Sequence, residues 1–314
     1  MKSKLLAIAF GDLHLNEWKQ FNDDNCRLYA GVDVLVYLNA LALKKKVPLL
    51  FMGDLIHTDK YITNRLLSEA LPILKNMKNF YGIDGNHDQS EQNTHTHKSP
   101  SYFDTFAKIF NDIHCVNYRS VELENIVLHG IPYLTHNIGL KETMESFNIV
   151  KGKKNILMIH TDLHGAEDNN GISIDSTSNI PKDMDKFFEK FDIVLAGHIH
   201  KPQVLGDNIY MLGSPQQQRR TDMGSELGFW KVYKDKVTFT PFNKYPEFKT
   251  YNEGDEIDDF HFWTKLPKEL KASKTEFNFS AKTDKSKLAT SYCKTKGITD
   301  KRKVKALKKQ LGDQ

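Results

Sequence analysis

Short apolar runs alternate with longer amphipathic segments along the first 200 residues of the chain. Apolar runs bounded by Gly, Asp or Asn are typical of buried strands. Such runs occupy residues 4–10, 47–52, 79–83, 155–160 and 191–200. Segments with apolar residues at helical spacing separate them, at residues 26–46, 63–77 and 102–110, after His136, and from about Pro181. Strands that alternate with helices are typical of βαβ units, so the pattern predicts parallel sheets.

After His200 the pattern changes to short strands and turns. The strands predicted here span residues 203–206, 208–214 and 228–242, with one or two more at 121–134. Two polar segments, 88–101 and 164–179, are predicted to be loops. We therefore expect an α/β fold in which helices lie on the outer faces of the sheets.

The composition is that of a globular protein, with 39% hydrophobic and 27% charged residues. The first apolar run, residues 5–10, is shorter than the roughly 7–15 residues at the centre of a signal peptide, and Asp12 follows it. No apolar run approaches the roughly 20 residues that span a bilayer. The three cysteines, Cys26, Cys115 and Cys293, lie far apart and predict no disulfide framework. We therefore expect a cytoplasmic protein that does not bind a membrane.

Charge is distributed unevenly along the chain. Residues 264–314 hold 15 of the 44 Lys and Arg residues and 5 of the 40 Asp and Glu residues, so this segment has a formal charge of +10 and the remainder −6. A basic tail often contacts nucleic acid or an acidic partner, although a solvated lysine-rich terminus has the same composition. The body is predicted to end near Pro246, which divides the chain into a domain at 1–246 and a small basic region at 247–314.

Metal-ligand residues follow five of the predicted strands, and four of these strand ends lie beside a glycine. In chain order the residues are Asp12 and His14, Asp54 and His57, Asn86, His87 and Asp88, His160, and His198 and His200. The carboxyl ends of strands are where open α/β sheets bind ligands. Burying this many polar groups without partners costs at least several kcal/mol, and bound metal ions would satisfy them.

The ligand types indicate which ions could bind. Carboxylate, amide and imidazole groups suit divalent Mn, Fe, Zn and Co. Seven candidate ligands exceed what one tetrahedral ion takes: Asp12, His14, Asp54, Asn86, His160, His198 and His200. They suit two ions about 3.5–4 Å apart, an arrangement that activates water and binds a phosphoryl group for in-line displacement. His164 competes with His160 for one position, and strand register favours His160.

The order D-x-H, GD, GNHD, H and GHxH resembles the calcineurin-like metallophosphoesterase superfamily, and the match spans Asp12 to His200. The resemblance implies a four-layer αββα sandwich, here with a short C-terminal extension, and a dinuclear site. By position in the motifs it implies that Asp12, His14 and His200 hold one ion, that Asn86, His160 and His198 hold the other, and that Asp54 bridges them. His87 is implied to contact the phosphate or to protonate the leaving oxygen.

The residues after Asp54 separate branches of this superfamily. Protein serine/threonine phosphatases carry GDxVDRG and GNHE, whereas this chain has GDLIHTD and GNHD. His57 and the segments GHIHKPQV, YMLGSPQQQ and LGFWKVY are similar to the SbcD-type nucleases of DNA repair and recombination. That similarity implies an Mn²⁺-dependent exonuclease on duplex ends and endonuclease on single strands, with Mg²⁺, Fe or Zn as other possible ions. His57 is then implied to help place the DNA strand at the metals.

SbcD-like subunits work with an SbcC-like SMC-type ATPase and commonly form homodimers. The resemblance therefore implies DNA, this ATPase and a second copy of the chain as partners. Residues 247–314 are too few for a full capping domain and ATPase-binding helices, which suits a minimal, phage-encoded member in the host cytoplasm. A final predicted helix has Val304, Leu307 and Leu311 on one face as a candidate ATPase-binding stripe, and its lysines could equally touch phosphates.

Two other functions stay open from the sequence. A small-molecule or cyclic-nucleotide phosphodiesterase would use the same dinuclear site and would not need the basic tail. A non-enzymatic scaffold would recruit a partner through the tail but would have no need of every ligand. Arg219 and Arg220 could contact phosphate in an enzyme, although surface arginines are the default interpretation.

Overall fold

The computed structural model describes residues 3–18, 26–57, 61–91, 93–174, 185–242, 245–252, 254–256 and 261–265. These residues belong to one unit, Met1–Lys265, and a second unit comprises Leu266–Gln314. The predicted helix with Val304, Leu307 and Leu311 lies outside the described residues. Residues 175–184 also lie outside them; they comprise the end of the second predicted loop and the start of the helix expected from Pro181.

Six strands form the first sheet in the order β12-β11-β1-β2-β3-β4. Their bounds are β1 Leu5–Phe10, β2 Leu49–Phe51, β3 Phe80–Gly82, β4 Ile113–Cys115, β11 Gly228–Tyr233 and β12 Val237–Pro241. The strands β1 to β4 run parallel, since a helix connects each to the next. The late strand β11 pairs antiparallel with β1, with Ile8 opposite Lys231.

The second sheet also has six strands, in the order β5-β6-β7-β8-β10-β9. Their bounds are β5 Ser120–Glu122, β6 Ile126–Ile131, β7 Lys154–His160, β8 Ile193–Gly197, β9 Gln203–Leu205 and β10 Ile209–Met211. The four central strands β6, β7, β8 and β10 are parallel, and the two edge strands are antiparallel to their neighbours. The carboxyl ends of β7 and β8 therefore lie at the same edge of this sheet.

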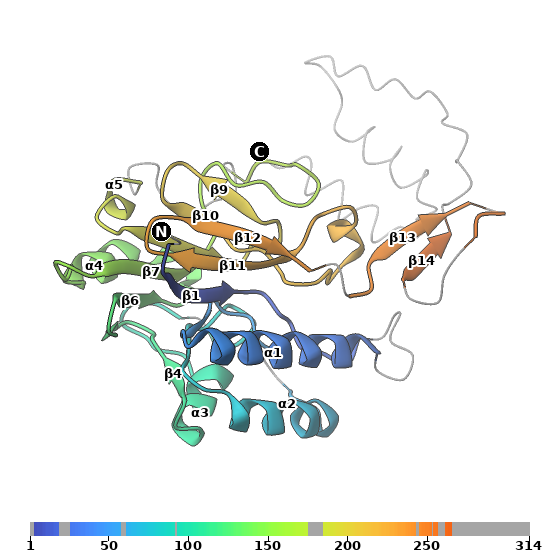
Figure 1. Ribbon diagram of the computed structural model, residues 1–314, viewed down its shortest axis with the longest axis horizontal. Helices are drawn as coiled ribbons and strands as arrows, with labels where there is room; N and C mark the ends of the chain where they lie inside the picture. The colour runs from blue at the N-terminus through green and yellow to red at the C-terminus, as the bar shows by residue number, and fades with distance from the viewer. Residues whose placement is uncertain are drawn as a thin grey trace, which may run out of the picture. The chain divides into compact units, whose positions relative to one another are not determined.

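The two sheets pack face to face, and helices cover their outer faces (Figure 1). Leu50 and Met52 of the first sheet share a buried cluster with Leu128, Met158 and Leu195 of the second. The outer face of the first sheet packs against α1 (Cys26–Lys45), α2 (Asn64–Asn76) and α3 (Tyr102–Ile109). The outer face of the second packs against α4 (Leu140–Ser146) and α5 (Asp185–Phe188). The four layers confirm the predicted α/β sandwich.

The structure adds detail that the apolar pattern does not contain. The strand β4 is absent from the predicted elements because its three residues, Ile-His-Cys, form no apolar run. The segment 121–134 contains both possible strands, β5 and β6, and the segment 228–242 divides into β11 and β12. The helix α2 continues through Pro72, and α5 has only four described residues.

Two short parallel strands, β13 (Phe248–Tyr251) and β14 (Phe262–Lys265), follow the predicted boundary at Pro246. The Phe248 amide donates a hydrogen bond to Gln217 Oε1 at 2.5 Å. The Arg27 guanidinium lies 5.1 Å from the centre of the Phe248 ring and donates to the Gln218 carbonyl at 2.7 Å. The first residues after Pro246 thus contact the sandwich directly, while the domain boundary itself stays a prediction.

Among the described residues, α1 is the one helix long and apolar enough to cross a membrane by length and composition alone. Its residues Leu28, Leu35 and Leu38 are fully buried in the cluster beneath the first sheet. Core helices of globular proteins pass the same test, and these contacts identify α1 as one of them.

Removal of the Phe103 ring should destabilise the sandwich. Phe103 is fully buried on α3, and its ring centre lies 5.5 Å from those of Phe51 and Phe80. We expect Phe103→Ala to lower the free energy of unfolding by about 3–5 kcal/mol, because it leaves a cavity that neighbouring rings fill incompletely. Urea denaturation measures this change. Ile109→Ala on the same helix is the control, since Ile109 is 61% exposed; equal losses in both variants would contradict the packing described here.

Candidate metal centre

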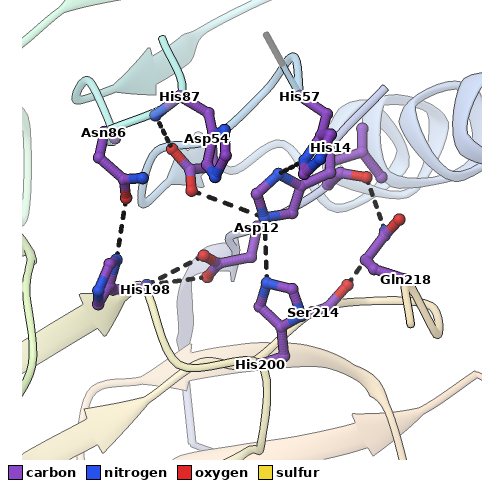
Figure 2. Close-up of polar contacts among 12 residues, drawn as sticks. Asp12, His14, Asp54, His57, Asn86, His87, His198, His200, Ser214 and Gln218 are labelled. Atoms are coloured by element: carbon purple, nitrogen blue, oxygen red, sulfur yellow. Dashed lines mark hydrogen bonds and ion pairs between the residues drawn. The ribbon is translucent and has the colours of Figure 1, made fainter. Parts of the chain in front are cut away.

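The seven predicted ligands meet where the carboxyl ends of strands from both sheets come together, and Figure 2 labels all of them except His160. From the first sheet, Asp12 and His14 follow β1, Asp54 follows β2 and Asn86 follows β3. From the second sheet, His160 ends β7, and His198 and His200 follow β8. Asp12, His14, Asp54 and His160 are at most 2% exposed. The site therefore joins the two sheets at one edge of the sandwich.

One group of ligands consists of Asp12, His14 and His200. His14 Nε2 and His200 Nε2 are 3.0 Å apart. One ligand atom from each of the three residues lies within 4.8 Å of those of the other two. The Asp12 carboxylate also accepts hydrogen bonds from the His198 amide at 3.0 and 3.2 Å, which fixes its orientation.

A second group consists of Asn86, His160 and His198. Asn86 Oδ1 lies 3.2 Å from His160 Nε2 and 2.9 Å from His198 Nδ1. These two nitrogens are 3.3 Å from each other. The other nitrogen of His160, Nδ1, lies 2.6 Å from the Met52 carbonyl oxygen. A proton on Nδ1 would donate to this carbonyl and leave Nε2 free to bind an ion.

Asp54 lies between the two groups (Figure 2). Its Oδ2 is 3.6 Å from His14 Nε2 of the first group and 3.5 Å from His160 Nε2 of the second. Its Oδ1 accepts a hydrogen bond from the His87 amide at 2.8 Å. Asp54 therefore lies within reach of both groups, and its role as the bridging ligand stays a prediction.

The spacing of these atoms fits metal ions. Two ligand atoms that bind one ion at about 2.1 Å lie about 3.0–3.4 Å apart, for right-angled and tetrahedral geometry respectively. Six separations among His14, Asp54, Asn86, His160, His198 and His200, from 2.9 to 3.6 Å, fall close to this range. Oxygen and imidazole ligands without cysteine suit a pair of catalytic divalent ions. The residues present could therefore hold two ions with Asp54 shared between them.

The electrostatics of the centre favour cation binding. Burial alone would raise the pKa of Asp54, but His160 and His14 outweigh it and hold this pKa below its ordinary value. Burial would lower the pKa of His160, but Asp54 and Asp12 raise it to about 9. Without a metal His160 is therefore protonated at neutral pH. An ion that binds its Nε2 must displace that proton, so metal affinity should fall as the pH falls.

Backbone conformation at the strand ends is unusual. The φ angles of Asp12, His14, Asp54 and His198 are 48°, 50°, 62° and 97°, in the left-handed half of the map that residues other than glycine seldom adopt. Such conformations cost about 1–3 kcal/mol each and cluster at functional sites. These residues turn the chain sharply after β1, β2 and β8, which brings their polar side chains into one centre.

Asp88 connects two of these turns. Its buried carboxylate accepts hydrogen bonds from the amides of Asp54, Leu55 and Gly85 at 2.7–3.0 Å. A side chain on Gly85 would meet the Asp54 carboxylate, since a Cβ there would lie 2.0 Å from Oδ1. Asp88 therefore acts as a hydrogen-bonding partner of the two ligand loops.

His57 and His87 lie beside the first ligand group. His57 Nδ1 is 3.0 Å from His14 Nδ1, the nitrogen that faces away from Asp54. The rings of His57 and His87 stack with centres 4.6 Å apart, and the centre of the Trp18 ring also lies 4.6 Å from that of His57. Burial lowers the pKa of His87 and lowers that of His57 to about 4, which favours the neutral form of each imidazole. The contact of His57 with His14 Nδ1 orients the His14 ring.

The sequence analysis missed two carboxylates at the centre. Asp222 Oδ2 lies 3.5 Å from His200 Nδ1, and Asp162 Oδ1 lies 3.2 Å from His198 Nε2. Asp222 lies in the short 3-10 helix Arg220–Asp222, away from any strand end, whereas Asp162 follows β7 two residues after His160 and carries the same strand-end signal as the predicted ligands. His97, by contrast, is exposed and pairs with Glu91 at 3.2 Å, as expected for the polar loop that contains it.

A cavity of about 450 Å³ opens over the ligands. Its walls combine both ligand groups with two loops, and the lining residues are His14, Asp54, Asn86, His87, Asp168, Asn169, Asn170, His198, Ile199, His200, Arg219, Thr221 and Asp222. Asn170 and Arg219 are exposed, so solvent and a substrate can reach the centre.

Residues 6–202 match the family model of the calcineurin-like phosphoesterases, which covers more than half of the chain. The chain belongs to the calcineurin-like phosphoesterase family. Its similarity to a viral protein named "Putative phosphoesterase 244L", from Invertebrate iridescent virus 6, is 25% identity over 170 residues. This match covers 52% of the chain and 55% of the viral protein, so the chain spans about half the length of this relative. This family is one of phosphoester hydrolases that use divalent metal ions.

Asp54 should be required for metal binding at both positions. We expect Asp54→Asn to weaken Mn²⁺ binding by more than about tenfold and to lower the metal content, because both groups lose their shared negative charge. Elemental analysis after dialysis against Mn²⁺ measures the content. Asp168→Asn is the matched control, since Asp168 lines the same cavity outside both ligand groups. Equal metal content in the two variants would contradict the bridging role.

A second buried carboxyl should make stability depend on pH. Asp84 is 2% exposed, Asn117 Nδ2 donates to its Oδ2 at 2.5 Å, and burial raises its pKa to about 7. The folded state therefore holds this proton at pH values where the unfolded chain has lost it, so stability falls as the pH rises from about 4 to 7.

Asp84→Asn should remove this dependence and stabilise the protein by about 1–4 kcal/mol at pH 8. The asparagine oxygen can still accept from Asn117. Urea unfolding at pH 5 and pH 8 measures the difference, and a variant that loses as much stability as the wild type between these values would refute the assignment.

Proposed function

We propose that this protein is a Mn²⁺-dependent nuclease that hydrolyses phosphodiester bonds in DNA, as an exonuclease on duplex ends and an endonuclease on single strands. The observation that carries the proposal is the convergence of two ligand groups on Asp54 at the floor of a solvent-open cavity. Paired ions that share a carboxylate suit in-line displacement at a phosphoryl group. A cavity that is open to solvent leaves room for a phosphate that belongs to a longer chain.

Two features favour DNA over a small phosphodiester. His57 and the segments after His198 are similar to those of SbcD-type nucleases. The charge of +10 on residues 264–314 would attract a polyanion.

The proposed partners follow from the same similarity. An SbcC-like SMC-type ATPase would bind the C-terminal region, and a second copy of the chain would complete a homodimer. Both partners, and a location in the cytoplasm or host cytoplasm, are part of the proposal.

The chain's own residues would divide the work of hydrolysis. Bound divalent ions would supply an activated water and neutralise phosphoryl oxygens. Asp54 holds its negative charge between the two groups, and Asp12 is oriented by the His198 amide. His87 lines the same cavity as His200. A phosphate anion there would raise the pKa of the His87 imidazole, which could then take up a proton from solvent and give it to the leaving oxygen.

A DNA cleavage assay with the full-length protein tests the proposal. End-labelled duplex and single-stranded DNA are incubated with Mn²⁺, with and without an SbcC-like ATPase. We expect cleavage that chelation abolishes, and a loss of about 10²–10⁴-fold in kcat for His87→Ala, the range typical of a missing general acid.

His97→Ala is the control, because His97 is an exposed histidine outside the cavity. Failure to cleave either DNA, alone or with the ATPase, combined with hydrolysis of a cyclic nucleotide, would replace the nuclease by the small-molecule phosphodiesterase. Unchanged cleavage by His87→Ala would remove the proposed role of that imidazole.

A further inference from the structure

Asp222 connects residues 218 and 219, in the loop after β10, to the candidate ligand His200. Its Oδ2 accepts hydrogen bonds from the amides of Gln218 and Arg219 at 2.8 and 3.0 Å and lies 3.5 Å from His200 Nδ1. Asn169 Nδ2 donates to Oδ1 at 2.5 Å. Asp222 is 1% exposed, so these contacts are shielded from water. The backbone at Arg219 is thus held at a fixed position relative to a candidate ligand.

Gln218 secures the same loop from the other side. Its Nε2 donates to the Leu13 carbonyl at 2.8 Å, between Asp12 and His14. Its own carbonyl accepts from Arg27 Nη2 at 2.7 Å. The residue that precedes Arg219 is therefore attached to the first ligand loop, and Figure 2 shows Gln218 beside it.

Arg219 is the one Lys or Arg among the described residues that line the cavity. Within the described part of the chain no carboxylate forms an ion pair with its guanidinium. The charge of Arg219 reaches the centre, because it contributes to lowering the pKa values of His57 and His87 after the larger effect of burial. Arg219 is therefore an exposed cation on a fixed backbone at the wall of the cavity, and among the described residues its guanidinium has no ion-pair partner.

We propose that Arg219 binds the non-bridging oxygens of the scissile phosphate and positions it over the two ligand groups. The planar guanidinium fork matches two oxygens of a phosphate group, and the fixed backbone limits the freedom lost on binding. The inference rests on the proposed function for the identity of the phosphodiester, but the chemistry recognised is that of any phosphate oxyanion.

The neighbouring Arg220 supplies a matched control. The two arginines are adjacent in the sequence QQQRRTD, and both are exposed. Arg220 begins the short 3-10 helix Arg220–Asp222 and does not line the cavity. The sequence gives no reason to distinguish the two arginines, whereas in the structure Arg219 lines the cavity and Arg220 does not.

The test compares wild type, Arg219→Ala, Arg219→Lys and Arg220→Ala as full-length proteins. Steady-state hydrolysis of bis(4-nitrophenyl) phosphate with Mn²⁺ gives kcat and KM, and calorimetric titration with inorganic phosphate gives a binding constant without turnover. Elemental analysis gives metal content.

For Arg219→Ala we expect phosphate affinity and kcat/KM to fall roughly tenfold to a hundredfold, the range for a lost charged hydrogen bond. Arg219→Lys should fall between Arg219→Ala and wild type, because lysine keeps the charge but not the fork. Arg220→Ala should stay within about twofold of wild type, as surface changes usually do. Metal content should be equal in all four proteins.

Equal phosphate affinity in Arg219→Ala and Arg220→Ala would overturn the inference, as would a loss of metal from Arg219→Ala alone. A wild type that binds phosphate through Arg219 yet hydrolyses no phosphodiester would refute the proposed function and leave the Arg219 site standing. The two failures are therefore distinguishable.

Discussion

The candidate centre depends on one buried negative charge. Asp54 is 2% exposed, and its carboxylate contacts His14, His160 and the His87 amide, which come from three different strand ends. A carboxylate in such a place is tolerable only with cationic or hydrogen-bonding partners around it. The same condition explains why imidazoles from both sheets gather at this point. The interaction that makes the centre able to hold cations also holds the two sheets together at this edge.

Much of the fold and most of the ligand set could be predicted from residue patterns. Apolar runs located seven of the twelve sandwich strands individually, and the segments 121–134 and 228–242 contained four more. The clearest runs became β2, β3 and β8, which are buried on both faces. The ligands were recognisable because each follows such a run, and the order of motifs assigned Asp54 to the middle. The strand β4 escaped because Ile-His-Cys is too short to show a pattern.

Other features depend on tertiary contacts that no local pattern records. Asp222 belongs to a short 3-10 helix well beyond the strand that His200 follows, so its approach to His200 cannot be read from the local sequence. The position of Arg219 at the cavity also depends on a tertiary contact, because its amide donates a hydrogen bond to the buried Asp222 carboxylate. The sequence does not distinguish Arg219 from Arg220 in this respect. The left-handed conformation of Asp54 also depends on a residue distant in the sequence, because the Asp88 carboxylate accepts hydrogen bonds from the amides at this turn.

The pairing of β1 with β11 has a consequence for how the chain is made. The strand β1 lies inside the first sheet, between β2 and a strand that begins only at Gly228. At a synthesis rate of about 5–20 residues per second, one edge of β1 waits on the order of ten seconds or more for its neighbour. An apolar strand with an open edge can pair with other chains during that interval. The strand β1 is synthesised before the other strands of its sheet but is among the last to be enclosed, and nascent chains are most exposed to misassembly there.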